Sequence, residues 1–241
     1  MINTKNCDII VMGGMGPMAG LELHKLLITL NKNVKKDQDH KSILHICYPN
    51  KIGDRTTYLL SNKKVGENPG QEALDILTNN NISKDIPYIL GVPCNTFHSS
   101  KIFNVFSEGV LKLYPNIKII HMINLVLEKV KRFSKVGLLC TAGTKKTKIY
   151  GENMIMYPDQ NKINDLIYNS QYGIKSLSYI SPYVEKELFT IIDEMDVDCV
   201  ILGCTELCLL ETTTTNKKIL INPLEILANE LLTLSSTYSK L

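Results

Sequence analysis

The sequence lacks any apolar run that approaches the ~20 residues of a membrane-spanning helix. Near Met1, no basic segment leads into a long apolar stretch and no small-residue cleavage site follows, so no secretory signal peptide is recognisable. From these absences we expect a soluble, cytoplasmic protein with no membrane partner.

A strong charge imbalance is also missing. The 27 lysines and arginines exceed the 24 aspartates and glutamates by only 3, and the lysines are scattered rather than gathered on one periodic face. Nucleic acids and anionic membrane surfaces are bound by clustered basic residues. We therefore expect no nucleic-acid partner for this chain.

The cysteine pattern excludes two further classes of protein. Seven cysteines, with no pair separated by two residues and no secretory context, argue against a disulfide framework. Cys204 and Cys208 are four residues apart, but no histidine pair follows them, so we expect no metal site. Four other cysteines lie in apolar, strand-like runs and are expected in the core: Cys7, Cys47, Cys140 and Cys199.

Strand-like and helix-like segments alternate along the whole chain. Strands are expected over 8–12, 42–48, 87–92, 118–123, 135–140, 154–157, 197–202 and 218–221. Helices are expected over 17–31, 69–77, 99–113, 125–133, 160–169 and 184–195 and from residue 223 onward. This alternation predicts parallel sheets covered by helices.

The strand and helix pattern occurs twice. Each half has a glycine-bearing turn early, at Gly13-Gly14 and at Gly143, and a cysteine turn late, at Cys94 and at Cys204. We therefore predict an α/β fold of two similar lobes related by an approximate two-fold axis, with the site in the cleft between them. The lobes are assigned by range: 1–114 with 222–241, and 115–221.

Cys94 and Cys204 each follow a β-branched, apolar run that ends in small and polar residues. Both cysteines are therefore expected at the carboxyl ends of buried strands, where open α/β sheets bind ligands. Two thiols on opposite sides of one carbon can invert a stereocentre, since one thiolate removes a proton and the other thiol returns one. A free thiol, with a pKa of about 8.5, is close to the range that suits a general base.

Small polar residues surround the two cysteines. They are suited to bind a carboxylate, and to stabilise the charge that proton removal loads onto it: Asn95, Thr96, Thr141 and Thr205. Glu206 is an acidic neighbour that could hold a substrate ammonium group. The plainer interpretation is that both cysteines are buried bystanders, because two strand-end thiols 110 residues apart do not by themselves establish a site.

Two other stretches leave alternatives open. The glycine loop before Pro17 is either an ordinary turn with an anion-binding helix N-terminus or a dinucleotide fingerprint, although Gly20 falls one residue too far for the latter. Arg55 is either a solvated surface residue or a clamp for a carboxylate, because its guanidinium offers a planar fork. His98 follows the first cysteine and is expected on a helix.

Six motifs, in order over nearly the whole chain, resemble those of the aspartate/glutamate racemase family, and most closely its aspartate racemases: Gly13-Gly14-Met15-Gly16-Pro17, Asp54-Arg55-Thr56, Gly66-Glu67-Asn68-Pro69, Pro93-Cys94-Asn95-Thr96-x-His98, Gly137-Leu138-Leu139-x-Thr141-x-Gly143-Thr144 and Gly203-Cys204-Thr205-Glu206-Leu207. The resemblance implies a two-lobed racemase of an acidic amino acid, with no pyridoxal phosphate, metal or other cofactor. It also implies a homodimer, since family members are often dimers.

The resemblance also implies roles for individual residues. By motif, Cys94 and Cys204 are the catalytic acid and base, and Arg55 binds a substrate carboxylate. The same motifs assign the rest of the substrate pocket: Met15, Asn95, Thr96, Thr141, Thr205 and Glu206. Where many aspartate racemases have a lysine four residues after a tyrosine, this chain has Tyr172 after Tyr168, and Lys175 lies nearby.

Two alternative functions remain at this point. One is a related cysteine-dependent isomerase or decarboxylase that acts on a dicarboxylate without an amino group. Glu206 bears on this choice, because an ammonium needs an anionic partner and a simple diacid does not. The other is a non-catalytic homologue that only binds carboxylates.

Overall fold

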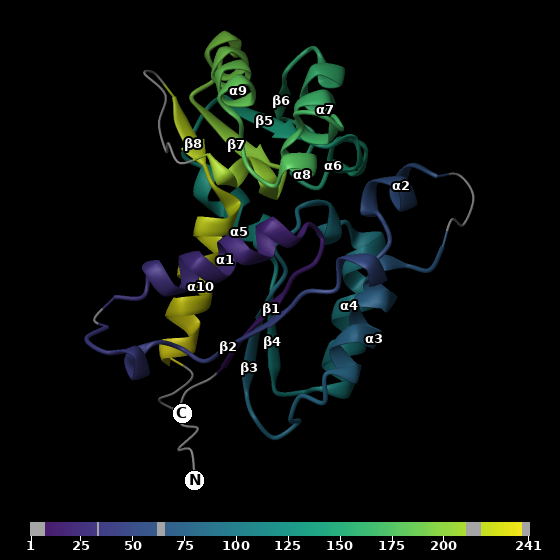
Figure 1. The fold of residues 1–241 in the computed structure, drawn as a ribbon, viewed down its shortest axis with the longest axis vertical. Helices are drawn as coiled ribbons and strands as arrows, with labels where there is room; N and C mark the ends of the chain where they lie inside the picture. The colour runs from purple at the N-terminus through teal and green to yellow at the C-terminus, as the bar shows by residue number, and fades with distance from the viewer. Residues whose placement is uncertain (1–7, 33, 62–65, 211–217, 238–241) are drawn as a thin grey trace.

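The computed structural model describes residues 8–32, 34–61, 66–210 and 218–237, and shows two parallel sheets flanked by helices (Figure 1). The strands are β1 (Asp8–Met12), β2 (Ile43–Ile46), β3 (Tyr88–Gly91), β4 (Ile117–Ile120), β5 (Val136–Cys140), β6 (Ile155–Met156), β7 (Cys199–Gly203) and β8 (Ile219–Ile221). The sheet orders are β2-β1-β3-β4 and β6-β5-β7-β8, with every pair parallel. Both sheets thus have the same strand order, which confirms the prediction of two similar α/β lobes.

The helices follow the expected alternation. They are α1 (Pro17–Thr29), α2 (Arg55–Leu60), α3 (Pro69–Asn79), α4 (Ser100–Leu113), α5 (Met122–Val130), α6 (Ala142–Thr147), α7 (Gln160–Tyr168), α8 (Ile174–Leu177), α9 (Pro182–Glu194) and α10 (Pro223–Thr237). Four short 3-10 turns cover Asp37–Asp39, Pro49–Lys51, Thr96–His98 and Thr205–Leu209. Prolines stand at the first position of α1, α3 and α9, where a missing N–H costs nothing.

β1 shows why these apolar runs form buried strands. Successive side chains point to opposite faces of a sheet. Ile9 and Val11 belong to the core cluster that contains α1 and α10, whereas Ile10 and Met12 belong to the cluster under α3 and α4. All four side chains are fully buried. The strand is apolar throughout because helices cover both of its faces.

The strand expected to open the second lobe belongs to the first sheet instead. β4 pairs with β3, Tyr88 opposite Ile117 and Gly91 opposite Ile120. The expected lobe boundary after residue 114 is therefore wrong for this strand, because α4 returns the chain to the neighbouring edge of the same sheet. The chain then enters α5 at Met122, earlier than the periodicity predicts.

α10 joins the two lobes. It follows β8 of the second sheet and runs down beside the first sheet, as the yellow helix in Figure 1 shows. Leu227 and Leu231 on α10 are fully buried. A side chain added at Gly91 on β3 would lie 2.9 Å from Leu231 Cδ1, so helix and strand are in close contact.

Three short helices were missed by the sequence prediction. α2, α6 and α8 contain 6, 6 and 4 residues, too few for helical periodicity to be visible. Side-chain caps define two of them: Asp54 accepts a hydrogen bond from the Thr57 amide at the start of α2, and Thr141 accepts one from the Thr144 amide at the start of α6.

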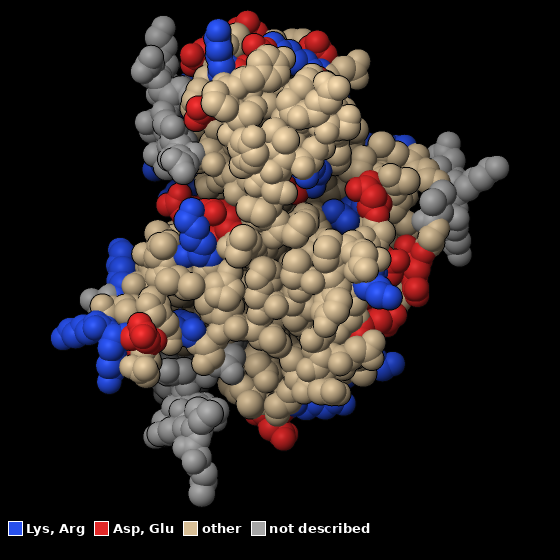
Figure 2. All heavy atoms as spheres, in the orientation of Figure 1, with Lys and Arg blue, Asp and Glu red and all other residues tan. Residues whose placement is uncertain are grey.

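Acidic and basic side chains are interspersed over the visible face of the molecule (Figure 2), as expected from the small net charge. Within the described part of the chain, none of the helices combines the length and apolar character needed to cross a bilayer.

Candidate active site

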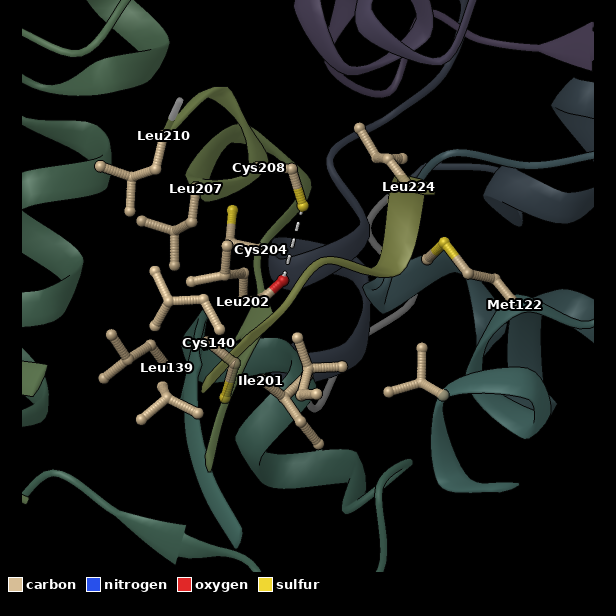
Figure 3. Close-up of a cluster of buried hydrophobic side chains, with 14 of the residues drawn as sticks. Met122, Leu139, Cys140, Ile201, Leu202, Cys204, Leu207, Cys208, Leu210 and Leu224 are labelled. Atoms are coloured by element: carbon tan, nitrogen blue, oxygen red, sulfur yellow. Dashed lines mark hydrogen bonds between the residues drawn. The ribbon is translucent and has the colours of Figure 1, made fainter. Parts of the chain in front are cut away.

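Cys94 and Cys204 occupy equivalent places in the two lobes. Cys94 follows β3 and Cys204 follows β7, the third strand in chain order of each sheet. Cys94 belongs to the core cluster under α3 and α4, and Cys204 to the other cluster, where it lies near Leu207 and Cys208 (Figure 3). Each thiol is only 5 % exposed. Both line one pocket, which has a cavity volume of about 20 Å³.

All nine site residues named from the sequence line this pocket: Met15, Arg55, Cys94, Asn95, Thr96, Thr141, Cys204, Thr205 and Glu206. Four further residues line it: Asp54, Thr56, Tyr168 and Lys175. Asp54 and Thr56 flank Arg55 in the sequence, and this position is the one signal that could have identified them as pocket residues.

Arg55 is fixed on the Cys94 side of the pocket by its helix. It is the first residue of α2, directly after the Asp54 cap. Its Nη2 donates to the Met15 carbonyl at 2.8 Å and its Nη1 to the Gly53 carbonyl at 3.0 Å. Burial alone would lower the pKa of Arg55, but Cys94 and Asp54 together raise it above its ordinary value. Arg55 is therefore a pocket residue and not a solvated surface arginine.

The Cys204 side of the pocket holds an acidic and a basic side chain that pair with each other. The Cys204 thiol donates to Glu206 Oε2 at 3.1 Å, and Lys175 Nζ donates to Glu206 Oε1 at 2.5 Å. Burial and the Glu206 carboxylate raise the pKa of Cys204 well above its ordinary value. Although burial would raise the pKa of Glu206, the Lys175 ammonium holds it below its ordinary value. Glu206 is thus an anion that favours the neutral thiol.

Lys175 is a second cation that lines the pocket, although the sequence alone shows only that it lies near Tyr172. It lies on α8 and its side chain is 24 % exposed. Although burial would lower the pKa of Lys175, the Glu206 carboxylate raises it, so the amine is protonated. Tyr172, in the slot expected for a lysine, instead bonds Asp165 and packs against Tyr183.

Three threonines hold the two lobes together beside the pocket. Thr96 Oγ1 lies 3.2 Å from Thr141 Oγ1 and 2.8 Å from Thr144 Oγ1. A side chain added at Gly143 would lie 3.0 Å from the Cα of Thr56, so α2 and α6 approach closely. These contacts join the Cys94 loop to the start of the second lobe.

Two buried nitrogen atoms in the pocket residues have no hydrogen-bond partner among the described residues: Arg55 Nε and Asn95 Nδ2. Asn95 is 2 % exposed, and its Oδ1 accepts a hydrogen bond from Tyr150. Unpaired buried donors are costly. Since both residues line the pocket, an acceptor such as a carboxylate can satisfy them there.

The glycine loop after β1 lies against Glu206. A side chain added at Gly16 would lie 2.2 Å from Glu206 Oε1 and 3.5 Å from Lys175 Nζ. Only glycine allows this approach without displacing the carboxylate. The loop therefore helps to enclose the pocket from the first lobe, with Met15 as the lining side chain.

His98 lies behind the pocket rather than in it. It ends the 3-10 turn after Cys94, and not a helix as expected from the sequence. Its Nδ1 donates to the Cys94 carbonyl at 2.8 Å, and its Nε2 accepts from the Met122 amide at 3.2 Å. Burial and the neighbouring His121 lower the pKa of His98 to about 3. His98 is therefore a neutral ring that fixes the Cys94 loop on α5.

The other cysteines follow the prediction with one exception. Cys140 and Cys199 are buried, as expected. Cys47 is exposed, so its prediction as a core residue is wrong, because β2 ends at Ile46 on the edge of the sheet. Cys7 lies outside the described residues.

Comparisons with known proteins agree with this fold. A family model described as Asp/Glu/Hydantoin racemase matches residues 12–231. The structure of Picrophilus torridus aspartate racemase aligns with 96 % of this chain and 94 % of that protein, with 25 % identity and a TM-score of 0.73.

Two more distant structures share the fold. An aspartate racemase homologue from Pyrococcus horikoshii OT3 has 18 % identity and a TM-score of 0.65, over 95 % of this chain and 99 % of that one. A glutamate racemase from Francisella tularensis, solved with D-glutamate, has 18 % identity and a TM-score of 0.61, over 97 % and 82 %.

Proposed function

Because the chain belongs to the Asp/Glu/hydantoin racemase family, we propose that it interconverts L- and D-aspartate, or a close acidic amino acid, without a cofactor. Cys94 and Cys204 act as the acid/base pair. The observation that carries this proposal is that the two thiols, one from each lobe, line a single pocket.

The reaction needs one proton removed and one returned. A thiolate takes the α-proton, so that an S–H bond forms and the electrons of the broken C–H bond delocalise into the α-carboxylate. The thiol on the opposite face then gives its proton to the α-carbon and becomes a thiolate. The product has the inverted configuration, and the two sulfurs have exchanged protonation states.

The two thiols have different electrostatic surroundings. Cys94 interacts with the Arg55 guanidinium. Cys204 donates its proton to Glu206, and the carboxylate favours the neutral thiol. In the free enzyme Cys204 therefore carries its proton and is the acid of the first half-reaction. After one turnover in that direction, the roles are reversed.

The charges of the pocket match an acidic amino acid. Arg55 and Lys175 are cations and Glu206 is an anion, while the Asp54 side chain, which also lines the pocket, accepts a hydrogen bond from the Thr57 amide at the start of α2. Aspartate carries two carboxylates and one ammonium, so each of its charges has an opposite partner. The Lys175–Glu206 pair separates to take one carboxylate and the ammonium. The unpaired Arg55 Nε and Asn95 Nδ2 are further donors for carboxylate oxygen. The 25 % identity to an aspartate racemase supports aspartate as the first substrate to test.

Solvent deuterium incorporation at the α-carbon tests the proposal directly. We expect both aspartate enantiomers to gain deuterium and lose optical rotation in D₂O. Cys94→Ser and Cys204→Ser should each lower the racemisation rate by at least about a hundredfold, because a hydroxyl is a poor acid/base at neutral pH. Cys47→Ser is the matched control, since Cys47 is exposed and does not line the pocket.

The serine variants, turnover of maleate and stabilisation by aspartate together separate the alternative functions. Full activity in either active-site serine variant would end the two-thiol mechanism. Turnover of maleate, which has no amino group, with no turnover of aspartate would instead identify a dicarboxylate isomerase. Stabilisation by aspartate without exchange or turnover would identify a non-catalytic binding protein.

A further inference from the structure

Tyr150 is a buried aromatic residue with a polar end inside the second lobe. It follows α6 in a turn where Lys148 and Gly151 both have positive φ, at 50° and 92°. This turn directs the Tyr150 side chain into the core, where it is 1 % exposed. The ring belongs to the same core cluster as Cys204 and Cys208. Tyr150 itself does not line the active-site pocket.

The Tyr150 hydroxyl crosses between the lobes to the Cys94 loop. It donates a hydrogen bond to Oδ1 of Asn95, which directly follows Cys94. Burial, with the nearby Cys208, raises the pKa of Tyr150 well above its ordinary value. The phenol therefore keeps its proton at neutral pH and remains a hydrogen-bond donor.

This bond decides which end of the Asn95 amide is available to a ligand. Asn95 has an acceptor oxygen and a donor nitrogen, and the two are similar in shape. With Oδ1 bound to Tyr150, Nδ2 is buried and without a partner in the described part of the chain. Asn95 lines the pocket, and the end of its amide that remains for a ligand is therefore the donor Nδ2. The reversed amide would present an oxygen to a carboxylate and repel it.

We propose that Tyr150 is a positioning residue, which acts through Asn95 to present Nδ2 to a substrate carboxylate. The proposal rests on the acidic amino-acid substrate proposed above. Proton removal at the α-carbon adds charge to the α-carboxylate, and a donor held in place lowers the barrier more than a mobile one. A residue of the second lobe, Tyr150, thus sets the orientation of the Asn95 amide in the first lobe.

A double-mutant cycle tests this role. Tyr150→Phe removes only the hydroxyl, and we expect kcat/KM for aspartate to fall by about tenfold or more. In an Asn95→Ala background, the same Tyr150→Phe change should lower kcat/KM by less than about twofold, because the group through which it acts is gone. Tyr157→Phe is the matched control, since the Tyr157 hydroxyl bonds Glu194 on the surface at 2.7 Å.

Two outcomes would overturn the proposal. One is full kcat/KM in folded Tyr150→Phe, with folding checked by circular dichroism. The other is an equal loss from Tyr150→Phe in the wild-type and Asn95→Ala backgrounds, which would indicate a structural role alone. Replacing Tyr150 by 3-fluorotyrosine, which keeps the hydroxyl, should restore kcat/KM to within about twofold of wild type.

Equilibrium binding of aspartate to the wild type, the two single variants and the double variant provides a second measurement of the same cycle. Binding without racemisation in the wild-type protein would end the proposed function but leave the Tyr150 coupling measurable. Absence of both binding and turnover would contradict both proposals. If the wild type racemises aspartate but the effects of Tyr150→Phe and Asn95→Ala simply add, the proposed role of Tyr150 is wrong and the proposed function stands.

Discussion

At the scale of single residues, the charge beside each thiol is the main feature of this site. Glu206 links Cys204 at 3.1 Å to Lys175 at 2.5 Å, whereas Cys94 interacts with Arg55. A symmetrical pair of thiols would give no reason for Cys204 in particular to hold its proton in the free enzyme. The asymmetry comes from one acidic and two basic side chains, Glu206, Arg55 and Lys175, which the shared strand order of the two lobes does not repeat.

The Glu206→Gln variant tests this charge asymmetry. The carboxylate raises the pKa of Cys204, so its removal, with Lys175 still present, should lower that pKa. In a Cys94→Ser background, we expect iodoacetamide to alkylate Cys204 at least about threefold faster at neutral pH. Peptide mass spectrometry at a series of pH values measures the rate.

Lys175→Met provides the control of opposite sign. The Lys175 ammonium lowers the pKa of Cys204, so its loss should slow the alkylation and move its pH dependence upward. If both variants shift the pH dependence of Cys204 in the same direction, the electrostatic explanation is wrong.

At the scale of elements, short capped helices place the charged groups. α2 contains only 6 residues, and its N-cap Asp54 accepts from the Thr57 amide at 2.6 Å. Arg55 follows the cap directly, so the start of the helix sets the direction in which the guanidinium leaves the backbone. α2 also packs against α6 of the second lobe.

Asp54→Ala removes the α2 cap, and we expect a loss of about 0.5–2 kcal/mol in the free energy of unfolding. The racemisation kcat/KM should fall as well, because Arg55 loses its fixed position. Asp54→Asn is the matched variant, since asparagine caps a helix as well as aspartate does. Urea unfolding and racemisation assays measure both effects. Equal stability of the alanine and asparagine variants would show that the cap does not hold α2.

At the scale of the whole molecule, α10 makes the two lobes depend on each other. It leaves the second sheet after β8 and packs against α1, α5 and β3. Leu227 and Leu231 contact Gly91 on β3. Since Cys94 follows β3 and Cys204 follows β7, the position of this helix fixes one thiol relative to the other.

Leu231→Ala tests the role of α10 in both lobes. Leu231 is fully buried, so its truncation should cost about 2–5 kcal/mol of unfolding free energy. Hydrogen exchange should increase in β1 and β3 as well as in α10. Thr233→Ala, at an exposed position of the same helix, should change stability by no more than about 0.5 kcal/mol. Faster exchange confined to the second sheet would contradict this role.

The sequence alone determined the class of fold and most of the site. Continuous apolar runs such as that of β7 predict parallel strands, and the small residues after them place Cys94 and Cys204 at strand ends. These are local properties of the chain, and nine pocket residues followed from them and from the family resemblance. Short helices such as α2 left no periodic signal, and Lys175 could not be aligned.

Only the tertiary structure decided which groups meet. β4 belongs to the first sheet because hydrogen bonding with β3, and not its own composition, chooses its neighbour. Lys175 reaches Glu206 from 31 residues away, and Tyr150 reaches Asn95 from 55 residues away. The sequence around a glutamate, a lysine or a tyrosine does not show whether the side chain lies on the surface or in a pocket. Their roles depend on distance and burial, which arise only when the two lobes pack together.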